Sequence, residues 1–124
     1  MAARHFVLAC AHRQAAVALQ KYRMPEHVVR DRIASELEGA TEVRCKFGRV
    51  DVLTSHHIIE VKSARKYKEA IGQVLVYSLC FPTRKPRVHL YDVSPESIKK
   101  AYDACWSLNI ELTYDPVIPR VPDI

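Results

Sequence analysis

The apolar residues between positions 26 and 38 recur at the spacing of a helix. Apolar side chains stand at every fourth position from residue 29 to residue 37, and Gly39 follows where a helix commonly ends. At about 100° per residue, Glu26 lies on the centre line of the same stripe. The pattern predicts a helix over residues 26–38, whose first acid either faces the core or complements the helix dipole.

Two runs of β-branched residues follow at positions 49–54 and 58–62. The short polar connection between them is typical of a β-hairpin. Alternation would place Val50, Val52 and Ile59 on one face, and the other face is also apolar. A sheet with two apolar faces is buried on both sides, so we expect helices on both faces.

The charged residues of this predicted hairpin share one face. If the connection has an even number of residues, Leu53 pairs with Ile58. Asp51 then lies directly opposite Glu60, whereas an odd number shifts the pairing by one residue. Opposed like charges are destabilising unless a cation lies between them, and Lys62 is on the same face as Glu60. The sequence therefore predicts a polar pocket at one edge of the sheet.

Strand and helix patterns alternate over the rest of the chain. They predict an edge strand at residues 42–47, a helix at 67–81, a strand at 87–92, a helix at 96–108 and a strand at 110–114. Gly72 costs a helix about 1 kcal/mol relative to Ala, which predicts that its helix backbone lies close to the sheet. His89 alternates with apolar neighbours and is predicted at the surface of its strand.

The ends of the chain differ from its centre. Residues 5–22 are rich in Ala, Leu and Val and predict an N-terminal helix, and three prolines after residue 115 predict an extended tail. The predicted fold is one α/β domain over residues 1–124, with three layers (α/β/α), a central mixed sheet, an αβββαβ core, a helical extension at 1–24 and a tail at 115–124.

The composition favours a polyanionic partner in a reducing compartment. Lys and Arg number 19 against 14 Asp and Glu, which gives a net charge of +5. The four cysteines are widely spaced, which predicts reduced thiols in the cytoplasm or nucleus and no zinc site. Residues 1–25 contain basic but no acidic side chains, which keeps organelle import as an alternative. The first apolar run is too short to cross a membrane, so no membrane partner is expected.

The order of these elements and charges resembles the PD-(D/E)XK, or restriction endonuclease-like, nuclease superfamily, and in particular its small Holliday junction resolvases and RecB-like members. Asp51 stands where the family has its Asp, although Val50 replaces the preceding Pro. The segment Glu60-Val61-Lys62 matches the E-x-K element. The resemblance covers roughly residues 26–92 and implies a restriction endonuclease-like core.

Two further elements of the resemblance lie on the predicted helices. Gln73 and Tyr77 look like the Q-x-x-x-Y element of the RecB-like branch. Glu26 is the best match to the acid on the first helix of the family, with Glu36 as the alternative.

The resemblance implies a metal-dependent nuclease that hydrolyses DNA phosphodiester bonds in repair, recombination or replication. Such a small domain has no room for reading a long sequence, so cleavage would be directed by DNA structure or ends. The implied catalytic residues are Asp51, Glu60, Lys62, Gln73 and Glu26. The implied ligands of Mg²⁺, for which Mn²⁺ could substitute, are Asp51, Glu60, the carbonyl of Val61 and Glu26. The expected DNA contacts are Arg65, Lys66, Lys68 and Tyr77.

Two expectations about partners accompany this function. A domain of this size covers little duplex, which predicts a homodimer on DNA. The alternative function is a catalytically inactive DNA-binding or assembly module on the same fold.

Overall fold

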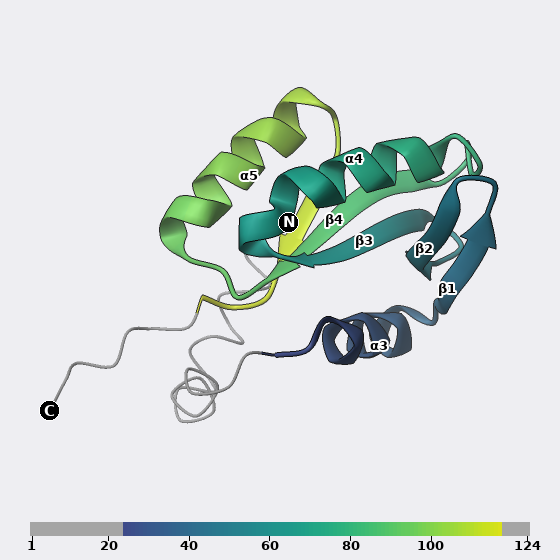
Figure 1. Cartoon of the computed structure of the whole chain (residues 1–124), viewed down its shortest axis with the longest axis horizontal. Helices are drawn as coiled ribbons and strands as arrows, with labels where there is room; N and C mark the ends of the chain where they lie inside the picture. Colours follow the sequence, from purple (N-terminus) through teal and green to yellow (C-terminus); the bar gives the residue numbers. More distant parts are fainter. Residues whose placement is uncertain (1–23, 118–124) are drawn as a thin grey trace, which may run out of the picture.

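The computed structural model describes residues 24–117 (Figure 1). The predicted N-terminal helix at residues 5–22 and the end of the predicted tail lie outside these residues. The elements are α3 (Glu26–Leu37), β1 (Ala40–Cys45), β2 (Gly48–Leu53), β3 (His57–Ser63), the 3₁₀ turn η1 (Ala64–Lys66), α4 (Tyr67–Ser78), β4 (Lys85–Tyr91), α5 (Pro95–Ser107) and β5 (Glu111–Tyr114). Every element predicted between residues 26 and 114 is present, and no end is shifted by more than three residues.

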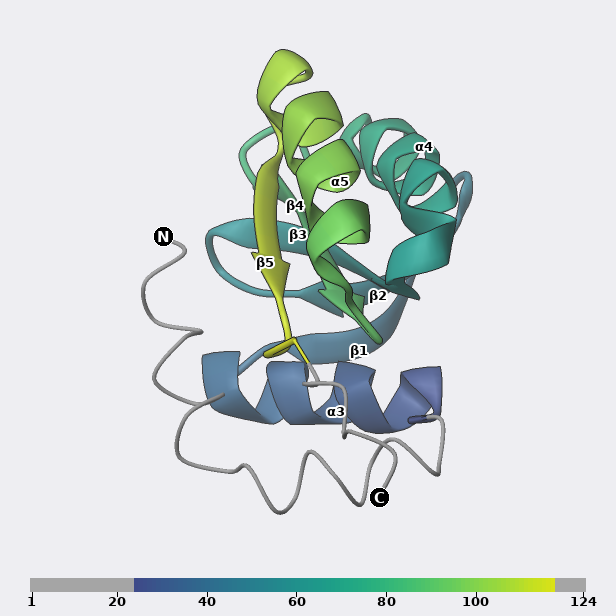
Figure 2. The ribbon, with the colours of Figure 1, turned by 90° about the vertical axis from the view of Figure 1, so that its left-hand side faces the viewer.

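The strands form one mixed sheet in the order β1-β2-β3-β4-β5. The pairs β1–β2 and β2–β3 are antiparallel, whereas β3–β4 and β4–β5 are parallel. Figure 2 shows α3 on one side of the sheet and α4 with α5 on the other. The mixed α/β architecture is therefore confirmed. None of the helices within residues 24–117 has the length and apolar character needed to cross a membrane.

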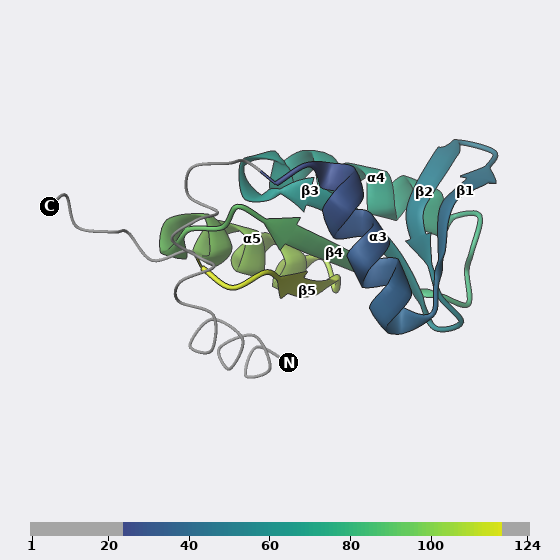
Figure 3. The same cartoon turned by 90° about the horizontal axis from the view of Figure 1, so that it is seen from below.

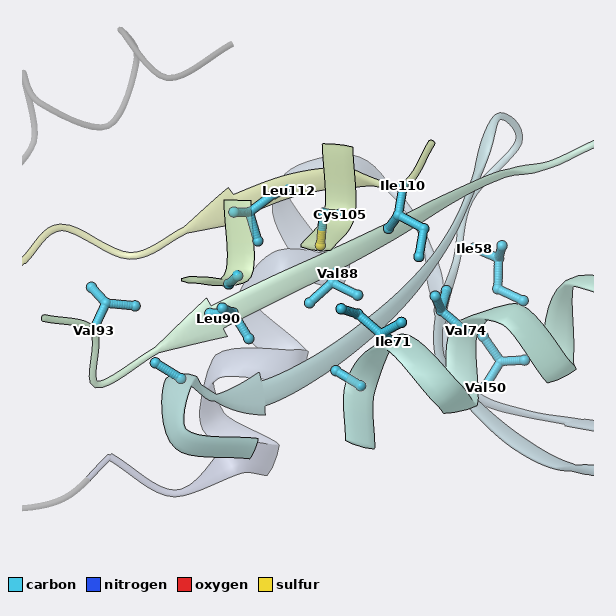
Figure 4. Packing of buried hydrophobic residues seen from close by; sticks show 13 residues of the cluster. Val50, Ile58, Ile71, Val74, Val88, Leu90, Val93, Cys105, Ile110 and Leu112 are labelled. Atoms are coloured by element: carbon cyan, nitrogen blue, oxygen red, sulfur yellow. The ribbon is translucent and has the colours of Figure 1, made fainter. Parts of the chain in front are cut away.

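A hydrophobic cluster lies on each face of the sheet. The cluster facing α4 and α5 includes Val50, Ile58, Val74, Val88 and Leu90 (Figure 4). The cluster facing α3 includes Val29, Ile33, Val52, Ile59 and Val61. The parallel strands are covered on both faces, as the apolar runs of the sequence require.

Strand β2 changes the face it presents at Asp51. Val52 packs in the α3 cluster, but Val50 packs in the cluster facing α4, so the prediction that both share one face is wrong for Val50. The change coincides with an irregular point on β1, where Glu42 has a left-handed backbone (φ 51°) between the two pairs that flank Asp51. Thr41 pairs with Val52 and Val43 pairs with Val50, but Glu42 and Asp51 do not form a pair in the ladder. The part of β1 and β2 that lies between Val43 and Val50 therefore faces α4.

The end of α3 differs from the expected glycine cap. Glu38, and not Gly39, adopts the left-handed conformation that ends the helix (φ 55°). Gly39 is needed for space, because a Cβ there would lie 2.9 Å from a methyl carbon of Val52. Leu37 is 42% exposed, and Ala34 is buried in its place.

Gly72 does not bring α4 close to the sheet. It is exposed, and a Cβ built on it meets nothing within 4 Å. The prediction of a close backbone approach is therefore wrong, and an alanine would fit at this position.

Candidate functional site

Asp51 and Glu60, called here the acid pair, meet where β2 and β3 separate. Leu53 pairs with Ile58, which confirms the even register, and the ladder ends one step later at Val52 and Ile59. Beyond that point, the Asp51 N–H donates to Glu60 Oε2 at 2.9 Å. The Val61 N–H donates to Asp51 Oδ2 at 2.8 Å. The carboxylates thus accept the backbone hydrogen bonds of the opposite strand, where strand carbonyls would otherwise do so.

Burial keeps the acid pair from carrying two full charges. Glu60 is only 1% exposed, and burial together with the charge of Asp51 raises its pKa to about 8. Burial also raises the pKa of Asp51, although the hydrogen bond from Val61 opposes this. Near neutral pH, the pair therefore retains a proton, which we assign mainly to Glu60.

Lys62 pairs with the acid on α3. Its Nζ lies 3.3 Å from Glu26 Oε1. Burial opposes the ammonium charge, but Glu26 and Asp51 outweigh it and raise the pKa of Lys62 above its ordinary value. Glu36 pairs with a different residue, because its Oε1 lies 3.8 Å from Nη1 of Arg32, one turn earlier on the same helix. The structure therefore places Glu26, and not Glu36, beside the predicted site.

The two predicted residues on α4 have different surroundings. Tyr77 packs its hydroxyl against Gly48, and burial together with the charge of Glu60 raises its pKa, so the phenol stays protonated. Gln73 is half-buried one turn earlier and makes no side-chain hydrogen bond to Glu60 or Lys62 within the described residues. The structure brings Tyr77 close to the acid pair but does not join Gln73 to Lys62.

The predicted DNA-contacting cations follow β3 directly. Arg65 and Lys66 lie in η1 and Lys68 in the first turn of α4, and all three are exposed. Lys68 Nζ lies 6.0 Å from the ring centre of Tyr67. In the described part of the chain, no acid forms an ion pair with any of the three cations.

The predicted metal ligands do not form a ready site. Between residues 24 and 117, no group of three or more His, Cys, Asp or Glu side chains is arranged to hold a metal ion. The acid pair accepts two backbone N–H groups, and Glu26 is paired with Lys62.

A second polar cluster was not foreseen from the sequence. His89 is buried (3% exposed), so its prediction as a surface residue is wrong. Its Nδ1 lies 2.7 Å from Thr113 Oγ1 and its Nε2 lies 2.9 Å from Asp115 Oδ1. Asp115 also accepts from Arg32 of α3 at 2.7 Å. These partners are distant in sequence, and only the parallel pairing of β4 with β5 reveals them.

The chain is similar to KilA-N domain-containing proteins of Acanthamoeba polyphaga mimivirus. One is 31% identical over 87 residues, which cover 70% of this chain and 24% of that protein. A second is 32% identical over 91 residues, which cover 73% of this chain and 37% of that protein. A third is 39% identical over 61 residues, or 49% of this chain and 16% of that protein. The chain thus corresponds to a minor part of each relative's length.

No family model and no solved structure gives a significant match. The similarity to KilA-N domain-containing proteins overturns the resemblance to PD-(D/E)XK nucleases, and the metal-dependent nuclease function inferred from that resemblance is wrong. The motifs that suggested it are short, and Glu-x-Lys occurs in many strands without catalytic meaning. What the comparisons establish is that the chain is similar to part of several viral KilA-N domain-containing proteins.

Proposed function

We propose that this chain is a DNA-binding module that contacts the phosphate backbone without hydrolysing it. The observation that carries this function is the set of exposed cations at Arg65, Lys66 and Lys68, which have no acid partner among residues 24–117. The net charge of +5 and the similarity to KilA-N domain-containing proteins support it. Contacts of this kind are independent of base sequence and weaken with salt.

Titration of a fluorescent DNA duplex at several salt concentrations tests this function. Arg65→Ala/Lys66→Ala removes two exposed cations, and Lys99→Ala/Lys100→Ala on α5 is a control with the same change of charge. We expect the first variant to bind about tenfold more weakly, with a salt slope shallower by about 1.8, because each phosphate contact contributes about 0.9. The control should stay within about twofold of wild type.

Two results would contradict DNA binding through these residues. One is a wild-type protein that does not bind the duplex at low salt. The other is an equal loss of affinity in the two double variants. The same DNA, incubated with Mg²⁺, should remain intact, and cleavage that disappears in Lys62→Ala would show that binding without hydrolysis is the wrong description.

We also propose that the acid pair binds Mg²⁺, or Mn²⁺ in its place, when DNA is present. Mg²⁺ is commonly held by one or two carboxylates together with phosphate oxygens and water. Asp51 and Glu60 would supply the carboxylates, with Glu26 and the Val61 carbonyl as further oxygen ligands. The lack of a Lys or Arg ion pair to Asp51 or Glu60 within residues 24–117 supports this arrangement, because Lys62 pairs with Glu26 instead.

Thermal unfolding with Mn²⁺ and DNA tests the metal site. We expect Mn²⁺ to raise the Tm of the wild-type complex by roughly 2–5 °C and to leave that of Asp51→Asn unchanged. Glu36→Gln is the matched control, since Glu36 is an exposed acid away from the pair. An equal shift in all three proteins would argue against the acid pair as the site.

The assembly and compartment that we propose follow from size and thiol chemistry. One domain of this size covers little duplex, so we propose a homodimer on DNA. The free thiols of Cys45, Cys80 and Cys105 support a reducing compartment, the cytoplasm or the nucleus.

A further inference from the structure

The turn between β1 and β2 carries a second group of cations, which we call the basic hairpin (residues 44–49). Arg44 pairs directly with Arg49 across the two strands, and both side chains are exposed. Directly opposed residues have Cβ atoms about 5 Å apart, and like charges placed in this way are destabilising. Neither arginine forms an ion pair with an acid in the described part of the chain. An anion bound between them would remove this repulsion.

The tip of the basic hairpin adds a third cation and an aromatic ring. Lys46 and Phe47 form the turn, and Lys46 Nζ lies 5.5 Å from the ring centre of Phe47. Phe47 is 46% exposed although it is a large apolar side chain. Cations beside an exposed ring suit a polyanion that also presents apolar or π surfaces, as a nucleic acid does.

The root of the basic hairpin is held in place. Gly48 has φ 148°, and a Cβ there would lie 2.7 Å from the Tyr77 hydroxyl. Val43 and Cys45 pack against the cluster that faces α4, and Val50 is fully buried within it. A segment that is already ordered loses little conformational entropy on binding. The cations are therefore presented by a fixed element.

The position of the basic hairpin leaves its tip accessible. Figure 3 shows β1 and β2 at one end of the sheet, with α5 at the other. A two-stranded ribbon of this kind fits the major groove of B-form DNA, which is about 12 Å wide. The major groove of A-form RNA is deep and narrow and does not admit it.

We infer that the basic hairpin enters the major groove of duplex DNA. This inference rests on the DNA binding proposed above. Arg44 and Arg49 together contact the phosphate backbone at the edge of the groove, and Phe47 at the tip contacts base edges. The cations of η1 and α4 lie at the other end of α4 from Tyr77 and would contact the backbone separately.

Binding of DNA and RNA duplexes of the same sequence tests this inference, with Arg44→Ala/Arg49→Ala compared against Lys99→Ala/Lys100→Ala. We expect the hairpin variant to bind DNA about tenfold more weakly, with a salt slope shallower by about 1.8, and the α5 control to stay within about twofold of wild type. Phe47→Ala should weaken binding by several-fold without changing the salt slope. Wild type should protect guanine N7, a major-groove atom, from methylation by dimethyl sulfate, and Phe47→Ala should protect it less.

The outcomes separate the inference from the function on which it rests. If wild type does not bind DNA, both fail. If wild type binds DNA but the hairpin variant binds as the α5 control does, DNA binding stands and the hairpin assignment fails. Equal affinity for the RNA duplex, or unprotected guanine N7, would overturn entry into the major groove. Circular dichroism and thermal unfolding identify any variant that has lost the fold, and Arg44→Lys/Arg49→Lys, which keeps both charges, should restore the salt slope.

Discussion

At the scale of single residues, the acid pair shows how two buried carboxylates can be tolerated within one sheet. Each carboxylate accepts a backbone N–H from the opposite strand, so the N–H groups of Asp51 and Val61 keep a hydrogen-bond partner where the ladder opens. The cost is electrostatic, because Glu60 is deeply buried next to Asp51 and its pKa rises to about 8. This cost makes the stability of the protein depend on pH.

We predict that the free energy of unfolding falls as pH rises from 4.5 to about 8. In this interval the folded protein holds the Glu60 proton while the unfolded chain, with the ordinary carboxyl pKa of 4.5, has lost it. The expected loss is roughly 2–4 kcal/mol, and Glu60→Gln should remove most of it. Urea unfolding at a series of pH values, with EDTA present to keep the acid pair free of metal, measures the effect. Glu36→Gln should retain the wild-type pH profile, and parallel profiles for wild type and Glu60→Gln would contradict the assignment.

At the scale of elements, two glycines have opposite roles. Gly39 follows α3 at a point where β2 leaves no room for a side chain. Gly72 lies on a face of α4 where a side chain would contact no other described residue. The sequence predicted that Gly72 lies against the sheet, because a glycine inside a helix is unfavourable unless the packing requires it. No neighbour within 4 Å requires it here.

We predict that Gly72→Ala raises the free energy of unfolding by about 1 kcal/mol, because alanine restricts the unfolded chain and favours the helix. Gly39→Ala should lower it, since the new Cβ would lie 2.9 Å from the Val52 side chain and 3.1 Å from the Leu53 carbonyl oxygen. Urea unfolding of both variants at one pH provides the comparison. A destabilised Gly72→Ala would mean that α4 has a neighbour at this position.

At the scale of the whole molecule, cations that pair with no acid of the described chain lie at both ends of α4. One group follows β3, and the other lies on the basic hairpin, whose Gly48 contacts Tyr77 near the end of the helix. Within residues 24–117, six acids form ion pairs with Arg30, Arg32, Lys62 and Arg87 instead. This division leaves a positive surface available to a polyanion.

We predict that the protein is a homodimer when bound to DNA. Light scattering of the protein with and without a DNA duplex measures the mass of the complex, and we expect two protein chains for each duplex. A single chain on DNA at high protein concentration would contradict this assembly.

The sequence was enough to predict the helices and strands between residues 26 and 114, and it limited the register of the β2–β3 hairpin to two alternatives. Periodicity and turn residues are local properties, so they predicted the helices and strands, whereas the structure selected the even connection that pairs Leu53 with Ile58. The short motifs, in contrast, led to the wrong family, because a few letters at common spacings recur in unrelated chains.

Which side chains meet depends on how the sheet and the helices pack. Val50 and Val52 lie on opposite faces next to the left-handed Glu42 of β1, and the helix direction brought Glu26 to Lys62 and left Glu36 with Arg32. The burial of His89 depends on Asp115, which the pairing of β4 with β5 brings beside it. The physical reason is that the local pattern of a chain sets the direction of each side chain within its element. Contacts between elements arise only when the sheet and the helices pack together.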